Sequence, residues 1–309
     1  MARTDDDTWD ITEGVGATAL SVARARAAES ENANPLFTDP YAGHFVEAAV
    51  LAGWQPPMAA ETLAEFSNDS AIVRRMQTMV SYIAARTRYF DEFFTTAGAN
   101  GLDQMVILAA GLDTRAWRLP WISGTAVYEL DQPKVLEFKA DVLAAHRARP
   151  AARYVPVAVD LRHDWPQMLC ANGFDPSVPT AWLAEGLLPY LSADDQDLLF
   201  ARVDGLSAPS SRLAGEAFGP EFFDPQNLSR RRERIAQVRH AATAAGVTVP
   251  DIEALWYLEP REDVGQWLQD RGWQISVIES DELMARYQRP VPAGAEDVAP
   301  QSLFVEAFK

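Results

Sequence analysis

Short, mainly apolar runs that alternate with helical stretches are the feature that most constrains the fold of this chain. The runs lie at about 105–109, 125–130, 154–159 and 180–184. Helical stretches follow the later runs, at about 133–146, 164–172 and 193–207. Because a strand that is apolar along its whole length is buried on both faces, the runs indicate parallel strands. Their alternation with helices predicts an α/β, doubly wound sheet.

The rest of the chain extends this pattern at both ends. Three further runs bring the expected sheet to seven strands, mostly parallel: 213–218, 274–279 and 303–308. Residues 219–259 interrupt the alternation and are expected to form a helical insertion after the fifth strand. Before the first strand, a helix is expected to begin at Pro40, and apolar residues three and four apart from Ile72 to Phe94 predict a longer one. We therefore expect 1–100 to be a helical segment and 101–309 to be the α/β core.

The composition excludes several classes of partner. Among 309 residues there are 27 Lys and Arg against 44 Asp and Glu, a net charge of −17, which argues against nucleic acid as a partner. The single cysteine, Cys170, cannot form an internal disulfide, and the four histidines are scattered, so no metal site is expected. No apolar run approaches the roughly 20 residues of a membrane span, and no secretion signal is visible. A cytoplasmic protein without a membrane partner is expected.

Acidic residues end the first four predicted strands. Asp113, Asp131, Asp160 and Glu185 each lie at or just beyond the end of one. Ligands of open α/β sheets bind outside these carboxyl ends. The alternative is that such residues cap the helices that follow. Asp131 comes 20 residues after Gly111, which is the spacing between a glycine turn and the acidic residue that accepts hydrogen bonds from ribose hydroxyls.

The chemistry of these residues favours one cofactor over another. The G-x-G-x-x-G motif of nicotinamide cofactor sites is absent, since only Gly111 of the turn is a glycine, and an acidic rim does not suit phosphates. S-adenosylmethionine (SAM) fits better, because its ribose and ammonium groups donate hydrogen bonds and its sulfonium is cationic. Its carboxylate needs a cation, and Arg86 beside the apolar stripe is a candidate, unless its head group reaches water instead. An NAD(P)-dependent oxidoreductase stays open as the alternative.

Five short motifs occur in an order that identifies a family. They are Asp39–Tyr41, Ala110–Leu119, Glu129–Pro133, Asp160–Arg162 and Ala184–Leu191. Together they resemble the leucine carboxyl methyltransferase-like family of class I SAM-dependent methyltransferases, in its bacterial branch. The resemblance runs from about residue 11 to the end of the chain. It implies a Rossmann-like fold in which the N-terminal helices form a lid and the insertion contributes to the substrate pocket.

The resemblance also implies which residues hold SAM. Arg86 would bind its carboxylate, and the turn at Ala109, Ala110 and Gly111 would pass under its methionine portion. Glu185 would lie near its amino group. Relatives often carry glycine where this chain has Ala109.

The remaining cofactor residues would hold the other end of SAM. Asp131 would bind the ribose, while Asp160 and Leu161 would bind the adenine end. Asp113 and Glu129 belong to the same motifs and are included among the expected cofactor-binding residues.

The expected reaction is methylation of a carboxylate or an acidic hydroxyl on a small molecule or peptide. Methyl transfer from a sulfonium releases a neutral group and depends mainly on in-line positioning. A carboxylate acceptor needs no general base, and the sequence offers no His–carboxylate pair to serve as one. Tyr190 and Arg115 could orient the acceptor, although Tyr190 could instead pack under the lid. A SAM-binding protein without turnover and an RNA methyltransferase stay open, the latter disfavoured by the charge.

Overall fold

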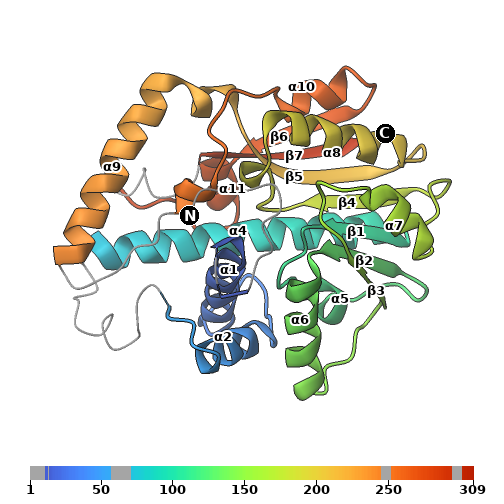
Figure 1. The fold of residues 1–309 in the computed structure, drawn as a ribbon, viewed down its shortest axis with the longest axis horizontal. Helices are drawn as coiled ribbons and strands as arrows, with labels where there is room; N and C mark the ends of the chain where they lie inside the picture. Colours follow the sequence, from blue (N-terminus) through green and yellow to red (C-terminus); the bar gives the residue numbers. More distant parts are fainter. Residues whose placement is uncertain (1–10, 13, 57–70, 245–251, 294–300) are drawn as a thin grey trace.

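One seven-stranded sheet forms the centre of the computed structural model, which describes residues 11–12, 14–56, 71–244, 252–293 and 301–309 (Figure 1). The strand order is β3-β2-β1-β4-β5-β7-β6. The strands are β1 (Gln104–Leu108), β2 (Ala126–Asp131), β3 (Arg153–Ala158), β4 (Thr180–Ala184), β5 (Arg212–Phe218), β6 (Gln274–Glu279) and β7 (Ser302–Phe308). The first five are parallel, and β7 pairs antiparallel with β5 and β6. The predicted seven-stranded, mostly parallel sheet is confirmed.

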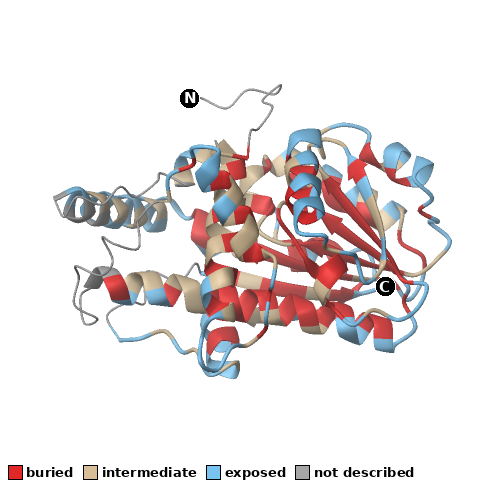
Figure 2. Cartoon of the chain, turned by 90° about the horizontal axis from the view of Figure 1, so that it is seen from below, coloured by how far each residue is buried: buried red, intermediate tan, exposed pale blue. Residues whose placement is uncertain are grey.

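Helices cover both faces of this sheet, and each face has its own hydrophobic cluster. The first face is covered by α1 (Gly14–Ser30), α2 (Ala42–Leu51), α4 (Ala71–Ala99), α5 (Arg115–Arg118), α6 (Pro133–Ala145) and α11 (Ser280–Arg286). The second is covered by α7 (Trp165–Ala171), α8 (Ala193–Gly205) and α10 (Val264–Gln269). Figure 2 shows the buried residues concentrated in the strands and on the helix surfaces that face them.

Strand β1 shows why the apolar runs predict this arrangement. All five of its residues are buried. Successive side chains of a strand point to opposite faces. Met105 and Ile107 accordingly join the cluster under α4, whereas Val106 and Leu108 join the cluster under α7 and α8. A strand in this position has no polar face, which is the pattern the sequence presents.

The clearest differences from the sequence prediction are the start of α2, the end of β1 and two short helices. Helix α2 begins at Ala42 and not at Pro40, because residues 39–41 form a turn in which Asp39 Oδ1 accepts hydrogen bonds from the backbone N–H groups of Tyr41 and Ala42. Strand β1 ends at Leu108, since Ala109 takes a φ of 50° and leaves the extended conformation. The short helices α5 and α11 were not predicted.

The insertion after β5 is helical, as predicted. It contains the 3₁₀ turns η2 (Pro220–Phe223) and η3 (Ile252–Leu255) on either side of α9 (Pro225–Ala244). Its returning end is tied to the 3₁₀ turn η1 (Leu188–Tyr190), since Tyr257 N donates to Pro189 O at 2.8 Å. Residues 245–251 of the insertion lie outside the described residues, as do 1–10, 13 and 57–70 of the predicted helical segment. The division of the chain at residue 100 stays a prediction.

The search for membrane spans gave a negative result within these ranges. None of the helices built from described residues is both long and apolar enough to cross a bilayer.

Candidate functional site

The turn after β1 is tight and lies under α1. Ala109 and Gly111 both have positive φ, 50° and 51°, a region that side chains with a Cβ rarely adopt. Ala110 N donates to Leu130 O of β2 at 3.0 Å. A Cβ added to Gly111 would lie 3.5 Å from the methyl group of Ala19 on α1. The turn therefore presents backbone, with little side chain, to the carboxyl ends of the strands.

Asp131, at the end of β2, is joined to this turn. Its Oδ2 accepts from Gly111 N at 2.6 Å, and its Oδ1 accepts from Gln132 N at 2.7 Å. Burial raises the pKa of Asp131, while these two N–H groups act in the opposite direction. A carboxylate oxygen that accepts one hydrogen bond can accept a second. Asp131 is thus held in a fixed orientation and retains capacity for a ligand.

Asp160 follows β3 and lies near the same place. Gln132 Nε2, from the residue next to Asp131, donates to Asp160 Oδ2 at 3.2 Å. Arg162 forms an ion pair with Asp160, its Nε 2.9 Å from Oδ1. Burial would raise the pKa of Asp160, but the hydrogen bonds from Arg162 outweigh it and hold the pKa below its usual value. The structure thus brings Asp131, Asp160 and the half-buried Leu161 to one end of the sheet.

Glu185, which follows β4, bridges two arginines. Its Oε1 is 3.0 Å from Arg86 Nε on α4, and its Oε2 accepts from Arg115 Nη1 at 2.7 Å. Burial would raise the pKa of Glu185, but Arg115 and Arg86 hold it below the usual value. Gly186 has a φ of 61°, and a Cβ there would lie 3.6 Å from Arg86 Nη1. The backbone at the end of β4 and the Arg86 guanidinium are thus packed together.

The guanidinium of Arg115 forms ion pairs with three carboxylates. Besides Glu185, its guanidinium pairs with Asp113 and, at 2.8 Å, with Asp91 Oδ1 of α4. Arg118 binds the same Asp91, its Nη2 2.7 Å from Oδ1. Arg115 is only 1% exposed. An acceptor could contact this guanidinium only after one of these ion pairs had broken, so the structure gives Arg115 no open position from which to orient one.

Two expected cofactor residues lie in the core. Glu129 is completely buried and forms an ion pair with Lys139 of α6, and burial raises its pKa to about 7 although Lys139 opposes the shift. Asp113 is buried against Arg115. Neither carboxylate is presented to a ligand in this structure. Tyr190, by contrast, is partly exposed at the end of η1.

Sequence reasoning missed three residues of the site. Arg86 Nη1 donates to Glu216 Oε2 of β5 at 2.8 Å. Glu216 Oε1 accepts from Ser302 Oγ of β7 at 2.9 Å and from the hydroxyl of Tyr82 on α4. A glutamate inside the apolar run 213–218 was the available signal, because a buried acidic residue needs a partner.

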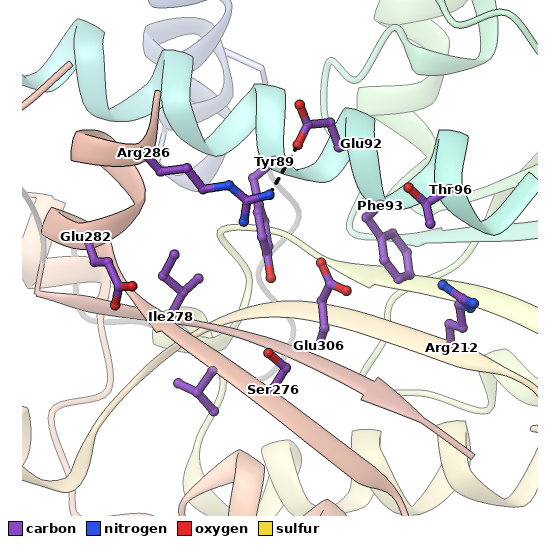
Figure 3. Close-up of a pocket in the computed structure, with 11 residues that line it drawn as sticks. Tyr89, Glu92, Phe93, Thr96, Arg212, Ser276, Ile278, Glu282, Arg286 and Glu306 are labelled. Atoms are coloured by element: carbon purple, nitrogen blue, oxygen red, sulfur yellow. Dashed lines mark ion pairs between the residues drawn. The ribbon is translucent and has the colours of Figure 1, made fainter. Parts of the chain in front are cut away.

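A cavity of about 410 Å³ lies elsewhere, between α4 and the antiparallel strands β6 and β7 (Figure 3). Tyr89 and Glu306 project into it from the helix and from β7, and Arg286 is directed at Glu92 on its rim. None of the predicted site residues lines it. In the part of the chain that the structure describes, no group of three or more His, Cys, Asp or Glu side chains could hold a metal ion.

Comparison with known proteins gives a consistent result. The family model for leucine carboxyl methyltransferase matches residues 19–204. A protein of Mycobacterium avium (strain 104), described as "Putative S-adenosyl-L-methionine-dependent methyltransferase", is 54% identical over 309 residues, covering 99% of this chain and 98% of its own. A protein of Mycobacterium marinum with the same description is 54% identical over 314 residues, covering 99% of each chain.

A solved structure shares the fold at low sequence identity. It is a DUF574 family protein from Streptomyces avermitilis MA-4680, with a TM-score of 0.50 and 16% identity, and the match covers 93% of this chain and 96% of that one.

Proposed function

Because the chain belongs to the leucine carboxyl methyltransferase family and is a SAM-dependent methyltransferase, we propose that it methylates an oxygen atom, that of a carboxylate or an acidic hydroxyl on a small molecule or peptide. The match to the leucine carboxyl methyltransferase model supports an oxygen acceptor, and the pairing of Arg86 with Glu185 at the end of β4 is the observation that carries the cofactor assignment. Around it, the residues at the ends of β1, β2 and β3 match the remaining groups of SAM.

The Arg86–Glu185 pair fits the amino acid end of SAM. Arg86 Nε lies 3.0 Å from Glu185 Oε1, yet it is buried and donates no hydrogen bond to any described residue. A ligand carboxylate on Arg86 and a ligand ammonium on Glu185 would replace this one ion pair by two charge-assisted hydrogen bonds. We assign Arg86 to the carboxylate and Glu185 to the ammonium.

The other end of SAM would lie along β2 and β3. Asp131, oriented by Gly111 N and Gln132 N, has remaining lone pairs for the ribose hydroxyls. Asp160 and Leu161 lie beside it for the adenine end, and Gly111 with its neighbours would pass under the methionine portion. We assign the buried Asp113 and Glu129 a supporting role behind these contacts.

The chain's own residues have a limited chemical task. Bound SAM supplies an electrophilic methyl group on a sulfonium, which leaves as a neutral thioether. A carboxylate acceptor is ionised at pH 7 and needs no base, so the protein has only to orient it in line and exclude water. The partly exposed Tyr190 is our candidate for orienting the acceptor. Arg115 holds Glu185 in place and is a positioning residue.

Aromatic residues in and beside the insertion at 219–259 suggest that the acceptor has an apolar portion. Phe218 at the end of β5 stacks on Phe222 with ring centroids 4.0 Å apart, and Trp256 lies 5.6 Å from Phe218. Aromatic rings of this kind favour hydrophobic ligand groups. We propose that this cluster forms part of the acceptor pocket and that α1 and α2, within residues 1–100, form the lid over it.

Calorimetric titration tests the cofactor assignment first. Wild type, Asp131→Ala and the control Asp141→Ala, changed at an exposed position on α6, are each titrated with SAM, S-adenosylhomocysteine and NAD. We expect SAM and S-adenosylhomocysteine to bind wild type and the control, and the binding to be lost in Asp131→Ala. Binding of NAD in place of SAM would reverse the proposal in favour of an oxidoreductase.

A screen with methyl-labelled SAM then tests the acceptor. A methylated carboxylate is an ester and releases volatile labelled methanol in base, whereas a methylated hydroxyl is an ether and does not. Label in nitrogen, or salt-sensitive labelling of RNA, would contradict the proposed acceptor class. SAM binding without label in any acceptor pool would favour a binding protein without turnover.

A further inference from the structure

Arg86 has two carboxylate partners, and the structure treats them differently. Glu216 Oε2 accepts a hydrogen bond from Arg86 Nη1 at 2.8 Å. Glu185 lies 3.0 Å from Arg86 Nε, but that nitrogen donates no hydrogen bond to it. Glu216 is therefore bound to the guanidinium by a hydrogen bond, whereas Glu185 is held to Arg86 by an ion pair alone.

Both carboxylate oxygens of Glu216 accept hydrogen bonds from side chains of neighbouring elements. Its Oε1 accepts from Ser302 Oγ at 2.9 Å and from the Tyr82 hydroxyl, and the two hydroxyls lie 2.9 Å apart. Glu216 is 7% exposed and Tyr82 is 2% exposed. The donors come from α4 and β7, so the carboxylate cannot rotate without breaking contacts to both elements. No solvent is needed to satisfy either oxygen.

We propose that Glu216, oriented by Tyr82 and Ser302, is a positioning residue that holds Arg86 ready for the amino acid end of the cofactor. The inference rests on the proposed function of Arg86 and Glu185. When a ligand ammonium takes Glu185, Arg86 keeps one protein carboxylate and gains the ligand carboxylate. Without Glu216, Arg86 would have Glu185 as its remaining carboxylate partner. Once a ligand ammonium took Glu185, the arginine side chain would have to lose rotamer freedom to bind the ligand carboxylate.

A purely structural role makes a different prediction. If Glu216 served only to tie α4 to the sheet, its loss would weaken all ligands of the site alike. A positioning role affects only ligands that carry the amino acid group. The probe pair is therefore S-adenosylhomocysteine and 5′-methylthioadenosine, which share the adenosine and a thioether but differ in that group.

The experiment compares the dissociation constants of both probes for wild type and Glu216→Gln by calorimetry. We expect the variant to bind S-adenosylhomocysteine roughly 10- to 100-fold more weakly, by analogy with removal of a partner behind a metal-binding side chain. It should bind 5′-methylthioadenosine as wild type does. The matched control is Glu306→Gln, which changes a glutamate of β7 facing Tyr89 of α4 in the separate cavity (Figure 3). Both affinities should be unchanged in it.

Two outcomes overturn the proposal. Equal weakening of both probes in Glu216→Gln would make Glu216 structural only, and unchanged binding of both would make it irrelevant. Binding of neither probe to wild type would instead refute the proposed cofactor site. If Glu216→Gln does not fold, Ser302→Ala and Tyr82→Phe decide the question, because each keeps the Arg86–Glu216 ion pair and removes one hydroxyl. They should show a smaller loss, again confined to S-adenosylhomocysteine.

Discussion

The ion pair between Glu129 and Lys139 allows a quantitative test of how buried charges beneath the proposed cofactor site contribute to the stability of the fold. Both side chains are completely buried, between β2 and α6, and Glu129 is two residues before Asp131 in the same strand. Lys139→Met keeps an apolar stem of similar length and removes the charge. Removing one member of a buried ion pair costs about 3–5 kcal/mol of unfolding free energy when the other member stays charged, so this range is an upper limit here, because Glu129 can take up a proton instead.

The cost should depend on pH in a defined direction. Burial raises the pKa of Glu129 from 4.5 to about 7 against the influence of Lys139, so without the lysine the pKa rises further. Below pH 7 the folded wild type and the folded variant both keep this carboxyl protonated. Above pH 7 it ionises in folded wild type but stays protonated in the folded variant, while both unfolded chains are ionised. The stability gap should therefore widen by about 1.4 kcal/mol per pH unit above 7.

Urea unfolding at pH 6 and pH 8 measures this gap for wild type, Lys139→Met and the double variant Glu129→Gln with Lys139→Met. The double variant has no ionisable group left in the pair, so its gap to the Lys139→Met variant should also change with pH, because only the single variant retains Glu129. A gap between wild type and Lys139→Met that is the same at both pH values would refute the reasoning. It would mean that Glu129 does not titrate in this range.

Three further predictions concern the strand ends. Ala109, at a φ of 50°, adopts a conformation that costs a non-glycine residue about 1–2 kcal/mol. Ala109→Gly should therefore raise the unfolding free energy by up to about 1 kcal/mol, after subtraction of the conformational entropy that glycine adds to the unfolded chain. A lower melting temperature would contradict this. Arg115→Lys should lose about 3 kcal/mol or more in urea unfolding, since a point charge cannot bind Asp91 and Glu185 as the guanidinium does. Arg115 and Arg86 hold the pKa of Glu185 below 4.5, so the carboxylate stabilises the fold above pH 4.5, and this contribution is lost as the pH falls through the folded-state pKa. The unfolding free energy of Glu185→Gln should therefore be less sensitive to acid than that of wild type. An equal loss of stability in both proteins would count against the ion pairs.

The strands could be predicted because central strands buried on both faces consist of consecutive apolar residues. Val106 and Leu108 on one face of β1 alternate with Met105 and Ile107 on the other, and such a run has few alternatives to a central parallel strand. The helix α4 could be predicted because its apolar residues recur at spacings of three and four. Helix α11, with seven residues, is too short for its periodicity to be recognised.

The partners of the site residues could not be predicted, because they are far apart in the sequence. Arg86 and Glu216 are separated by 130 residues, and no local pattern links them. The expectation that Arg115 orients an acceptor follows from its place just beyond β1, but its guanidinium is occupied by Asp113 two residues earlier and by the distant carboxylates Asp91 and Glu185. Pro40 likewise resembles a first helical residue, yet α2 begins two residues later, after a turn in which Asp39 accepts from Tyr41 N and Ala42 N.

The position of β7 has a consequence for how the chain acquires its active form. This strand is synthesised after the other six strands of the described sheet, yet it lies between β5 and β6 and pairs with both. Contacts this distant in sequence form slowly, since a long loop must close before they are made. Until β7 inserts, Glu216 lacks Ser302 and β6 has no place in the sheet. A chain in which β7 has not yet paired should therefore hold the parallel strands β1 to β5 and still be unable to bind its cofactor tightly, so binding competence should arise late in folding.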